Sequence, residues 1–141
     1  MNHFVRIMLV LSVGFCRVLI AQDTAHGADL SCAASLELPT RGLLAARAGS
    51  SGTVAAMIRI GKGGKMSALR LTGKNEILKA EVRVAIGLSH FTPRCAGRSL
   101  RVEFGFTLED PPTPSIIPPA VRFIPPNRFE LTFRRVMPNV D

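Results

Sequence analysis

Few side chains in this sequence have the types and spacing that catalysis requires. Glu109 and Asp110 are adjacent carboxylates, but neighbours in an extended strand point to opposite faces, so they cannot easily flank one bond. His90 directly precedes Phe91 at an expected helix end, where a capping or solvated role is ordinary. Three His and three Cys leave little material for a metal site. We therefore expect a protein that is not an enzyme and that has no metal, no cofactor and no small-molecule substrate.

The glycine-rich run from Gly61 to Lys65 calls for a test of phosphate binding. Gly64 and Lys65 are similar to the end of a P-loop, but Met66 stands where a Ser or Thr would bind magnesium. The element that follows is expected to be a strand, whereas a P-loop leads into a helix. We therefore interpret the run as a hairpin turn with two solvated lysines, Lys62 and Lys65.

Residues 1–27 are typical of a secretory signal peptide. Arg6 places a positive charge near the N-terminus, and an apolar run of about 15 residues follows, against the roughly 20 that span a bilayer. Small residues favour cleavage after Gly27, with cleavage after Ala21 as the alternative. An uncleaved anchor is the other interpretation, and the short run and Arg17 within it argue against it. The sequence thus predicts an exported protein, periplasmic or secreted.

Two cysteines, Cys32 and Cys95, follow the predicted signal peptide. An even pair in an exported protein is most simply a disulfide. The bridge would enclose about 60 residues, and a closure of that size stabilises a fold by about 4 kcal/mol on the chain-entropy model. The alternative is a pair of free, buried thiols.

The elements that would position these residues follow from composition and periodicity. The chain has 141 residues, 47% hydrophobic and 20% charged, which suits one core and one domain. Alternation of apolar and polar residues predicts strands at 53–60 and 66–72, joined as a hairpin. Asn75 as an N-cap and apolar residues at helical spacing predict an amphipathic helix over about 75–88, which Pro93 cannot continue.

The C-terminal half predicts further strands. The clearest is 99–109, followed by a proline-rich connection over 111–119 and by shorter strands at 121–124 and 128–136. One apolar and one polar face are typical of an antiparallel sheet covered on a single side. We therefore expect an α+β fold, with a small antiparallel sheet and one helix packed on one face, in a single domain over 28–141.

The run from Leu43 to Pro93 resembles the C-terminal domain of the TonB energy transducers. The corresponding residues are Ala45, Gly52-Thr53-Val54, Gly64-Lys65, Leu78 with Val82 and Ala85, and Phe91-Thr92-Pro93, with 100–108 as the third strand. Full transducers carry a membrane anchor and a long proline-rich spacer before this domain, and we expect this chain to lack both. The cysteine pair and residues 111–141 also lie outside the family pattern. The resemblance implies the fold without energy transduction.

The resemblance also implies a binding function. In the TonB family this domain captures a short extended peptide of an outer-membrane receptor by adding it as a strand to its sheet. The family's receiving edge is the third strand, which places Arg101, Glu103, Gly105 and Thr107 on the expected peptide-binding edge. The partner would be such a receptor peptide or another envelope protein. The last strand, 128–136, can instead occupy the same edge, and the sequence leaves the two arrangements open.

The alternative function is electrostatic. The formal net charge is +8, and a basic surface is expected from Arg98, Arg122, Arg128, Arg134 and Arg135. Such a surface would bind an anionic envelope polymer or a lipid surface. Nucleic acid is not an expected partner, because export separates the two and no aromatic residues are interleaved for stacking.

Overall fold

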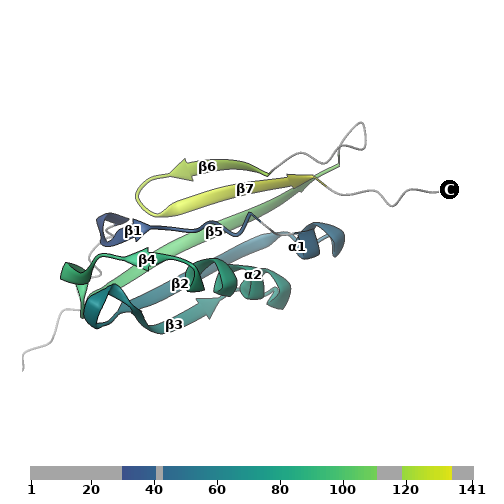
Figure 1. Ribbon diagram of the computed structural model, residues 1–141. Coiled ribbons are helices and arrows are strands. Elements are labelled where there is room, and N and C mark those ends of the chain that lie inside the picture. The colour runs from purple at the N-terminus through teal and green to yellow at the C-terminus, as the bar shows by residue number, and fades with distance from the viewer. Residues whose placement is uncertain (1–29, 41–42, 111–118, 135–141) are drawn as a thin grey trace, which may run out of the picture.

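The computed structural model describes residues 30–40, 43–110 and 119–134 (Figure 1). The predicted signal peptide with both cleavage sites, most of the proline-rich connection and Arg135 lie outside the described residues.

In the described part of the chain, the main sheet has five strands in the order β3-β2-β5-β7-β6. These strands are β2 (Gly52–Ile60), β3 (Met66–Thr72), β5 (Ser99–Glu109), β6 (Ala120–Ile124) and β7 (Arg128–Arg134). A separate antiparallel pair consists of β1 (Ala33–Ser35) and β4 (His90–Phe91), and the helices are α1 (Leu43–Arg47) and α2 (Glu76–Gly87). The expected α+β fold is confirmed, with strand bounds close to those that alternation predicts.

The main sheet is mixed, whereas a purely antiparallel sheet was expected. β7 runs parallel to β5, in a register that pairs Glu103 with Arg128 and Glu109 with Arg134, and the other pairings of the sheet are antiparallel. The reason lies in the order of the last strands. The chain leaves β5, returns as β6 on the outside, and then turns at Pro125–Asn127 to insert β7 between β5 and β6.

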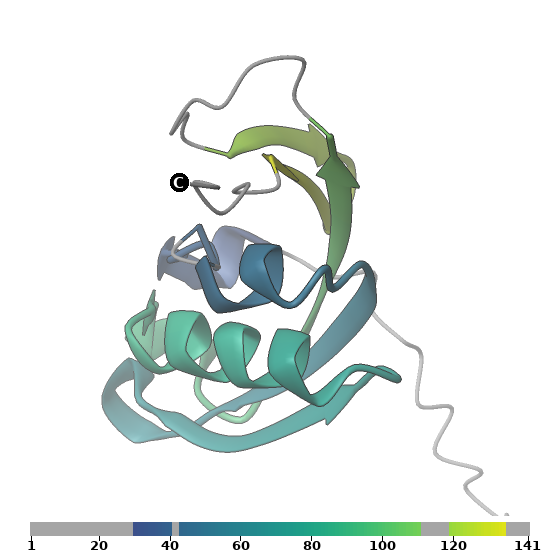
Figure 2. The ribbon, with the colours of Figure 1, turned by 90° about the vertical axis from the view of Figure 1, so that its right-hand side faces the viewer.

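Helix α2 covers one face of the sheet because its cap and its apolar stripe are both encoded locally. The side chain of Asn75 accepts hydrogen bonds from the backbone N–H of Ile77 (2.9 Å) and Leu78 (3.2 Å). The buried side chains of α2 are those of Leu78, Val82, Ala85 and Ile86. Figure 2 shows both helices on the same side of the sheet, with β6 and β7 extending the sheet past the helix layer.

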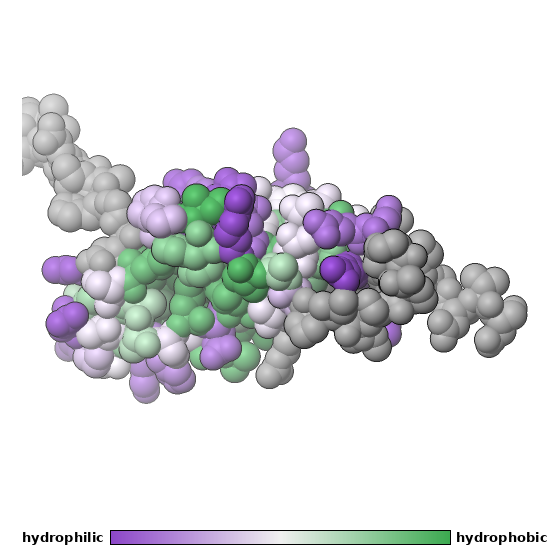
Figure 3. All heavy atoms as spheres, turned by 90° about the horizontal axis from the view of Figure 1, so that it is seen from above, coloured by the Kyte–Doolittle hydropathy of each residue, from purple (hydrophilic) through white to green (hydrophobic). Residues whose placement is uncertain are grey.

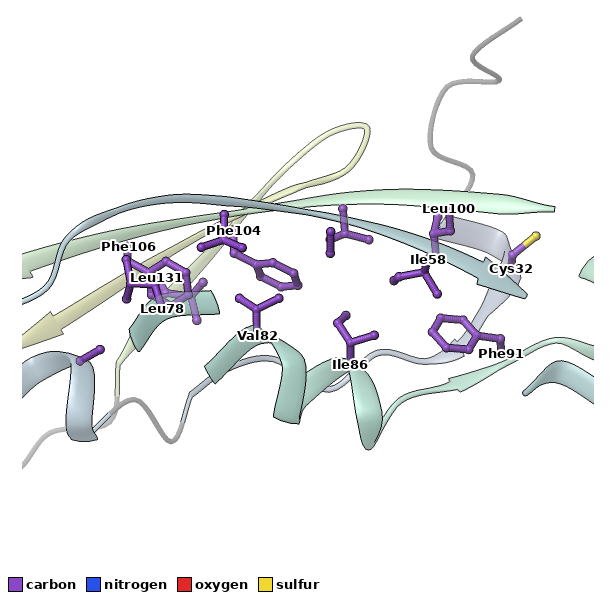
Figure 4. Packing of buried hydrophobic residues seen from close by; sticks show 14 of the residues in the cluster. Cys32, Ile58, Leu78, Val82, Ile86, Phe91, Leu100, Phe104, Phe106 and Leu131 are labelled. Carbon is purple, nitrogen blue, oxygen red and sulfur yellow. The ribbon is translucent and has the colours of Figure 1, made fainter. Parts of the chain in front are cut away.

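The core lies between α2 and the sheet. Val82 and Ile86 point from the helix toward Ile58 and Phe104 of the strands, and all four side chains are almost completely buried (Figure 4). At one end of the core, Cys32 and Cys95 form the expected disulfide, with 5.8 Å between their Cα atoms. The bridge attaches the N-terminal segment to the turn after β4.

Candidate functional site

The groups that the sequence offers for chemistry lie at exposed positions of the structure. Among the described residues, no three His, Cys, Asp or Glu side chains lie close enough to hold a metal ion. His90 is exposed at the start of β4, and Glu109 and Asp110 are exposed at the end of β5. A hollow of about 460 Å³ opens beside Thr53 and Ala55. Its lining includes Arg101 and Glu103, which are joined by a hydrogen bond of 2.7 Å, and the exposed Lys74.

The expected peptide-binding edge on β5 is already occupied. Glu103, Gly105 and Thr107 are paired with β7 over the whole length from Glu103 to Glu109. The N–H of Glu103 donates to the carbonyl oxygen of Asn127 at 2.9 Å. The backbone groups that a peptide would need are therefore satisfied by the protein itself, and the assignment of a receiving edge to these three residues was wrong.

The fourth expected edge residue, Arg101, is blocked differently. β7 does not extend to it, but the side-chain amide of Asn127 donates to the Arg101 carbonyl oxygen at 3.2 Å. Only Ser99–Val102 of β5 extend beyond β7. Four residues with one carbonyl already bound offer too short a template for an added strand.

The expected basic surface is interspersed with carboxylates where the structure describes it. Arg128 forms ion pairs with Glu130 and with Glu103 on the exposed face of the sheet. Arg122 lies opposite Glu130 across the β6–β7 pair, and Arg134 lies opposite Glu109. These arginines therefore alternate with carboxylates and form no continuous basic area, while Arg98 lies apart from them, in the turn before β5.

Gly105 has a packing role on this face. A Cβ atom built there would lie 2.5 Å from a carboxylate oxygen of Glu130. The missing side chain allows the Glu130 carboxylate to lie across β5, where it meets Arg128. Gly105 thus supports the acid–base network of the exposed face and does not serve as a peptide contact.

The free edge on this side of the sheet belongs to β6. Among the described strands, β6 pairs with β7 alone. Along β7, the backbone N–H and C=O groups of successive residues point alternately toward β5 and toward β6. Asn127 accepts from the Glu103 N–H and so points toward β5, which means that the backbone groups of Glu130 point toward Arg122 of β6. The N–H and C=O groups of the neighbouring residues, Val121 and Phe123, therefore point away from β7, toward the free edge.

A row of phenylalanine rings leads from the core to this edge. The rings of Phe104 and Phe129 have centroids 6.0 Å apart, and those of Phe129 and Phe123 are 5.0 Å apart. Phe104 is completely buried, whereas Phe123 is 45% exposed and its neighbour Val121 is 42% exposed. Figure 3, which looks down on the side where β6 lies, shows apolar side chains gathered in an area flanked by polar ones. The row ends at the free edge, where another strand could extend it.

Sequence reasoning predicted the strand at 121–124 but not its place at the edge. The alternation of Val121 and Phe123 with Arg122, between Pro119 and Pro125, indicates a short strand with one apolar face. Nothing in that pattern says that the strand lies outside β7.

No known protein family matches the chain, and neither does any curated protein or any solved structure. Within the described ranges, none of the helices has the length and apolar character needed to cross a membrane.

Proposed function

We propose that this protein is an exported, non-catalytic binding module that captures an extended peptide by strand addition at the free edge of β6. The observation that carries the proposal is the coincidence of outward backbone groups and exposed apolar side chains at Val121 and Phe123. In strand addition, the backbone hydrogen bonds supply affinity and alternate side chains supply selectivity. The Cys32–Cys95 disulfide supports export, since such bridges persist in oxidising compartments.

The chemistry of β6 indicates the chemistry of the peptide. Side chains of an added strand that lie opposite Phe123 and Val121 would extend the apolar rows, so apolar residues suit those positions. The residue between them would lie beside the exposed Arg122 on the other face, where a carboxylate is favoured. The expected motif is therefore apolar–acidic–apolar, in a receptor peptide or in another envelope protein.

Arg122 also argues against a second copy of the chain as the partner. A symmetric antiparallel pairing of two β6 strands centred on Arg122 would place the two guanidinium groups directly opposite one another. Like charges in that position are destabilising. The strand therefore favours a partner of different sequence.

The other edge strand, β3, is the weaker candidate. Its inward residues Leu69 and Leu71 are half-buried, and α2 packs against the strand. The side chains on its other face include those of Ala68, Arg70 and Thr72, and its one exposed large apolar residue, Met66, lies at the start of the strand. The β3 edge thus provides backbone groups without the exposed rings that β6 has.

Nuclear magnetic resonance can test the site with synthetic peptides of alternating Val and Glu. Binding should shift the amides of Val121 and Phe123 more than those of β3. Val121→Pro removes an outward N–H without removing a bond to β7, so it should abolish binding, whereas Val121→Ala keeps the donor and should weaken binding only partly. Changes in amide chemical shift that are confined to β3 on addition of the peptide would contradict the proposal, and so would equal binding by the two variants.

A further inference from the structure

Two turns are joined at the left-hand end of the coloured ribbon in Figure 1. One is the hairpin turn around Lys62–Gly64, and the other is the turn around Pro93–Cys95. The N–H of Gly97 donates to the carbonyl oxygen of Ile60 at 2.7 Å, and the N–H of Ile60 donates to that of Arg98 at 3.0 Å. These bonds hold the two turns side by side.

The joined turns are also anchored to the core. Cys95 is buried and is bonded to Cys32, and the N–H of Thr92 donates to the Cys32 carbonyl oxygen at 2.8 Å. Gly64 packs against the backbone at Phe91 so closely that a Cβ atom on it would lie 2.1 Å from the Phe91 carbonyl oxygen. The side chains on these turns therefore project from a fixed frame.

Four cations project from this frame: the exposed side chains of Lys62, Lys65, Arg94 and Arg98, together called the basic end. The described segments that build it, 30–35, 59–72 and 89–102, contain no Asp or Glu. None of the ion pairs between described residues involves any of the four cations. The basic end thus differs from the exposed face of β5–β7, where arginines are paired with carboxylates.

We propose that the basic end binds the surface of a phospholipid bilayer that carries anionic headgroups. The four cations lie on turns and line neither the hollow beside Thr53 nor the one beside Pro39, so the contact suits a flat surface better than a chain held in a groove. Met66, next to Lys65, is 38% exposed and gives the same end an apolar side chain. This surface is separate from the β6 edge, and the inference does not depend on peptide capture.

The size of the effect follows from the number of cations. Each Lys or Arg at an anionic membrane surface raises partitioning by about fivefold. Four such residues should therefore account for several-hundredfold of the partition coefficient, and added salt should weaken the binding.

Vesicle co-sedimentation of the oxidised protein tests this directly. The probes are vesicles of phosphatidylcholine mixed with phosphatidylglycerol, and vesicles of phosphatidylcholine alone. The basic-end variant carries Lys62→Gln, Lys65→Gln, Arg94→Gln and Arg98→Gln, and a matched control of equal net charge carries Arg47→Gln, Lys74→Gln, Arg83→Gln and Arg134→Gln, all at exposed positions. A double variant, Lys62→Gln with Lys65→Gln, serves if the fourfold one does not fold.

The unaltered protein should sediment with the anionic vesicles and not with the neutral ones. The basic-end variant should lose several-hundredfold of that affinity, the double variant about 25-fold, and the control far less than the basic-end variant. An equal loss in the basic-end variant and the control would show that net charge alone attracts the protein, and would overturn the proposal. Absence of binding to anionic vesicles, or competition by millimolar glycerol phosphate as strong as that by vesicles, would also overturn it.

Discussion

Two adjacent glycines in the β2–β3 turn allow the packing of the basic end to be measured. Gly63 and Gly64 have similar left-handed backbones, with φ of 71° and 76°. An alanine at Gly63 would meet no atom within 4 Å, whereas a Cβ at Gly64 would lie 2.1 Å from the Phe91 carbonyl oxygen and 3.2 Å from the Pro93 nitrogen. Gly63→Ala therefore measures the backbone strain alone, and Gly64→Ala measures the strain plus the collision.

The backbone strain and the collision can each be given a magnitude. A left-handed conformation costs a residue with a Cβ about 1 kcal/mol, so Gly63→Ala should lower the free energy of unfolding by that amount. Overpacking against backbone adds about 1–3 kcal/mol, so Gly64→Ala should lower it by about 2–4 kcal/mol. Urea unfolding of the oxidised protein, with similar slopes for both variants, would give the difference.

The comparison has a clear refuting result. If the two variants lose the same stability, Gly64 does not pack against the Phe91 backbone, and the two turns are not joined as described. A second measurement follows from the proposed membrane contact. Gly64→Ala should displace Lys65 relative to Arg94 and weaken binding to anionic vesicles, while Gly63→Ala should leave that binding nearly unchanged.

Four further perturbations test the disulfide, the row of phenylalanine rings and the helix cap. Reduction of the Cys32–Cys95 bridge, which joins residues 63 apart, should lower the free energy of unfolding by about 4 kcal/mol, as measured by urea unfolding with and without reductant. Phe104→Ala should lower the free energy of unfolding by about 3–5 kcal/mol because the ring is completely buried. Phe123→Ala should lower it by less than about 1 kcal/mol, and yet should weaken peptide binding as measured by nuclear magnetic resonance. Asn75→Ala removes the acceptor of two N–H groups and should cost about 1 kcal/mol in thermal unfolding, with a loss of helical signal that stays small.

Local patterns were enough to predict the hairpin and the helix. In β2, the alternation of buried Val54, Ala56 and Ile58 with more exposed neighbours is set by the two-residue period of a strand. In α2, the Asn75 cap fixes the start. Each of these signals acts within a few residues, so no knowledge of distant partners is needed to interpret it.

The position of β7 could not be predicted in the same way. Phe129, Leu131 and Phe133 alternate with polar residues, and this alternation is the same whether the strand runs parallel or antiparallel to its neighbour. The connection after β5 is long enough to reach either side of the returning pair. The resemblance to the TonB domain assigned the receiving edge to β5, and the insertion of β7 is the long-range choice that overturned this assignment.

The two proposed surfaces are arranged so that one leaves the other accessible. The basic end adjoins the start of β5 at Ser99, and β7 begins to pair with β5 at Glu103. Four residues of extended strand span about 13 Å, so the turn between β6 and β7 begins at about that distance from the basic end. From the turn, β6 runs back from Ile124 to Ala120, toward the level of Thr107, and so farther from the basic end. A bilayer held by the basic end would therefore leave the outward groups of Val121 and Phe123 free to pair with a peptide.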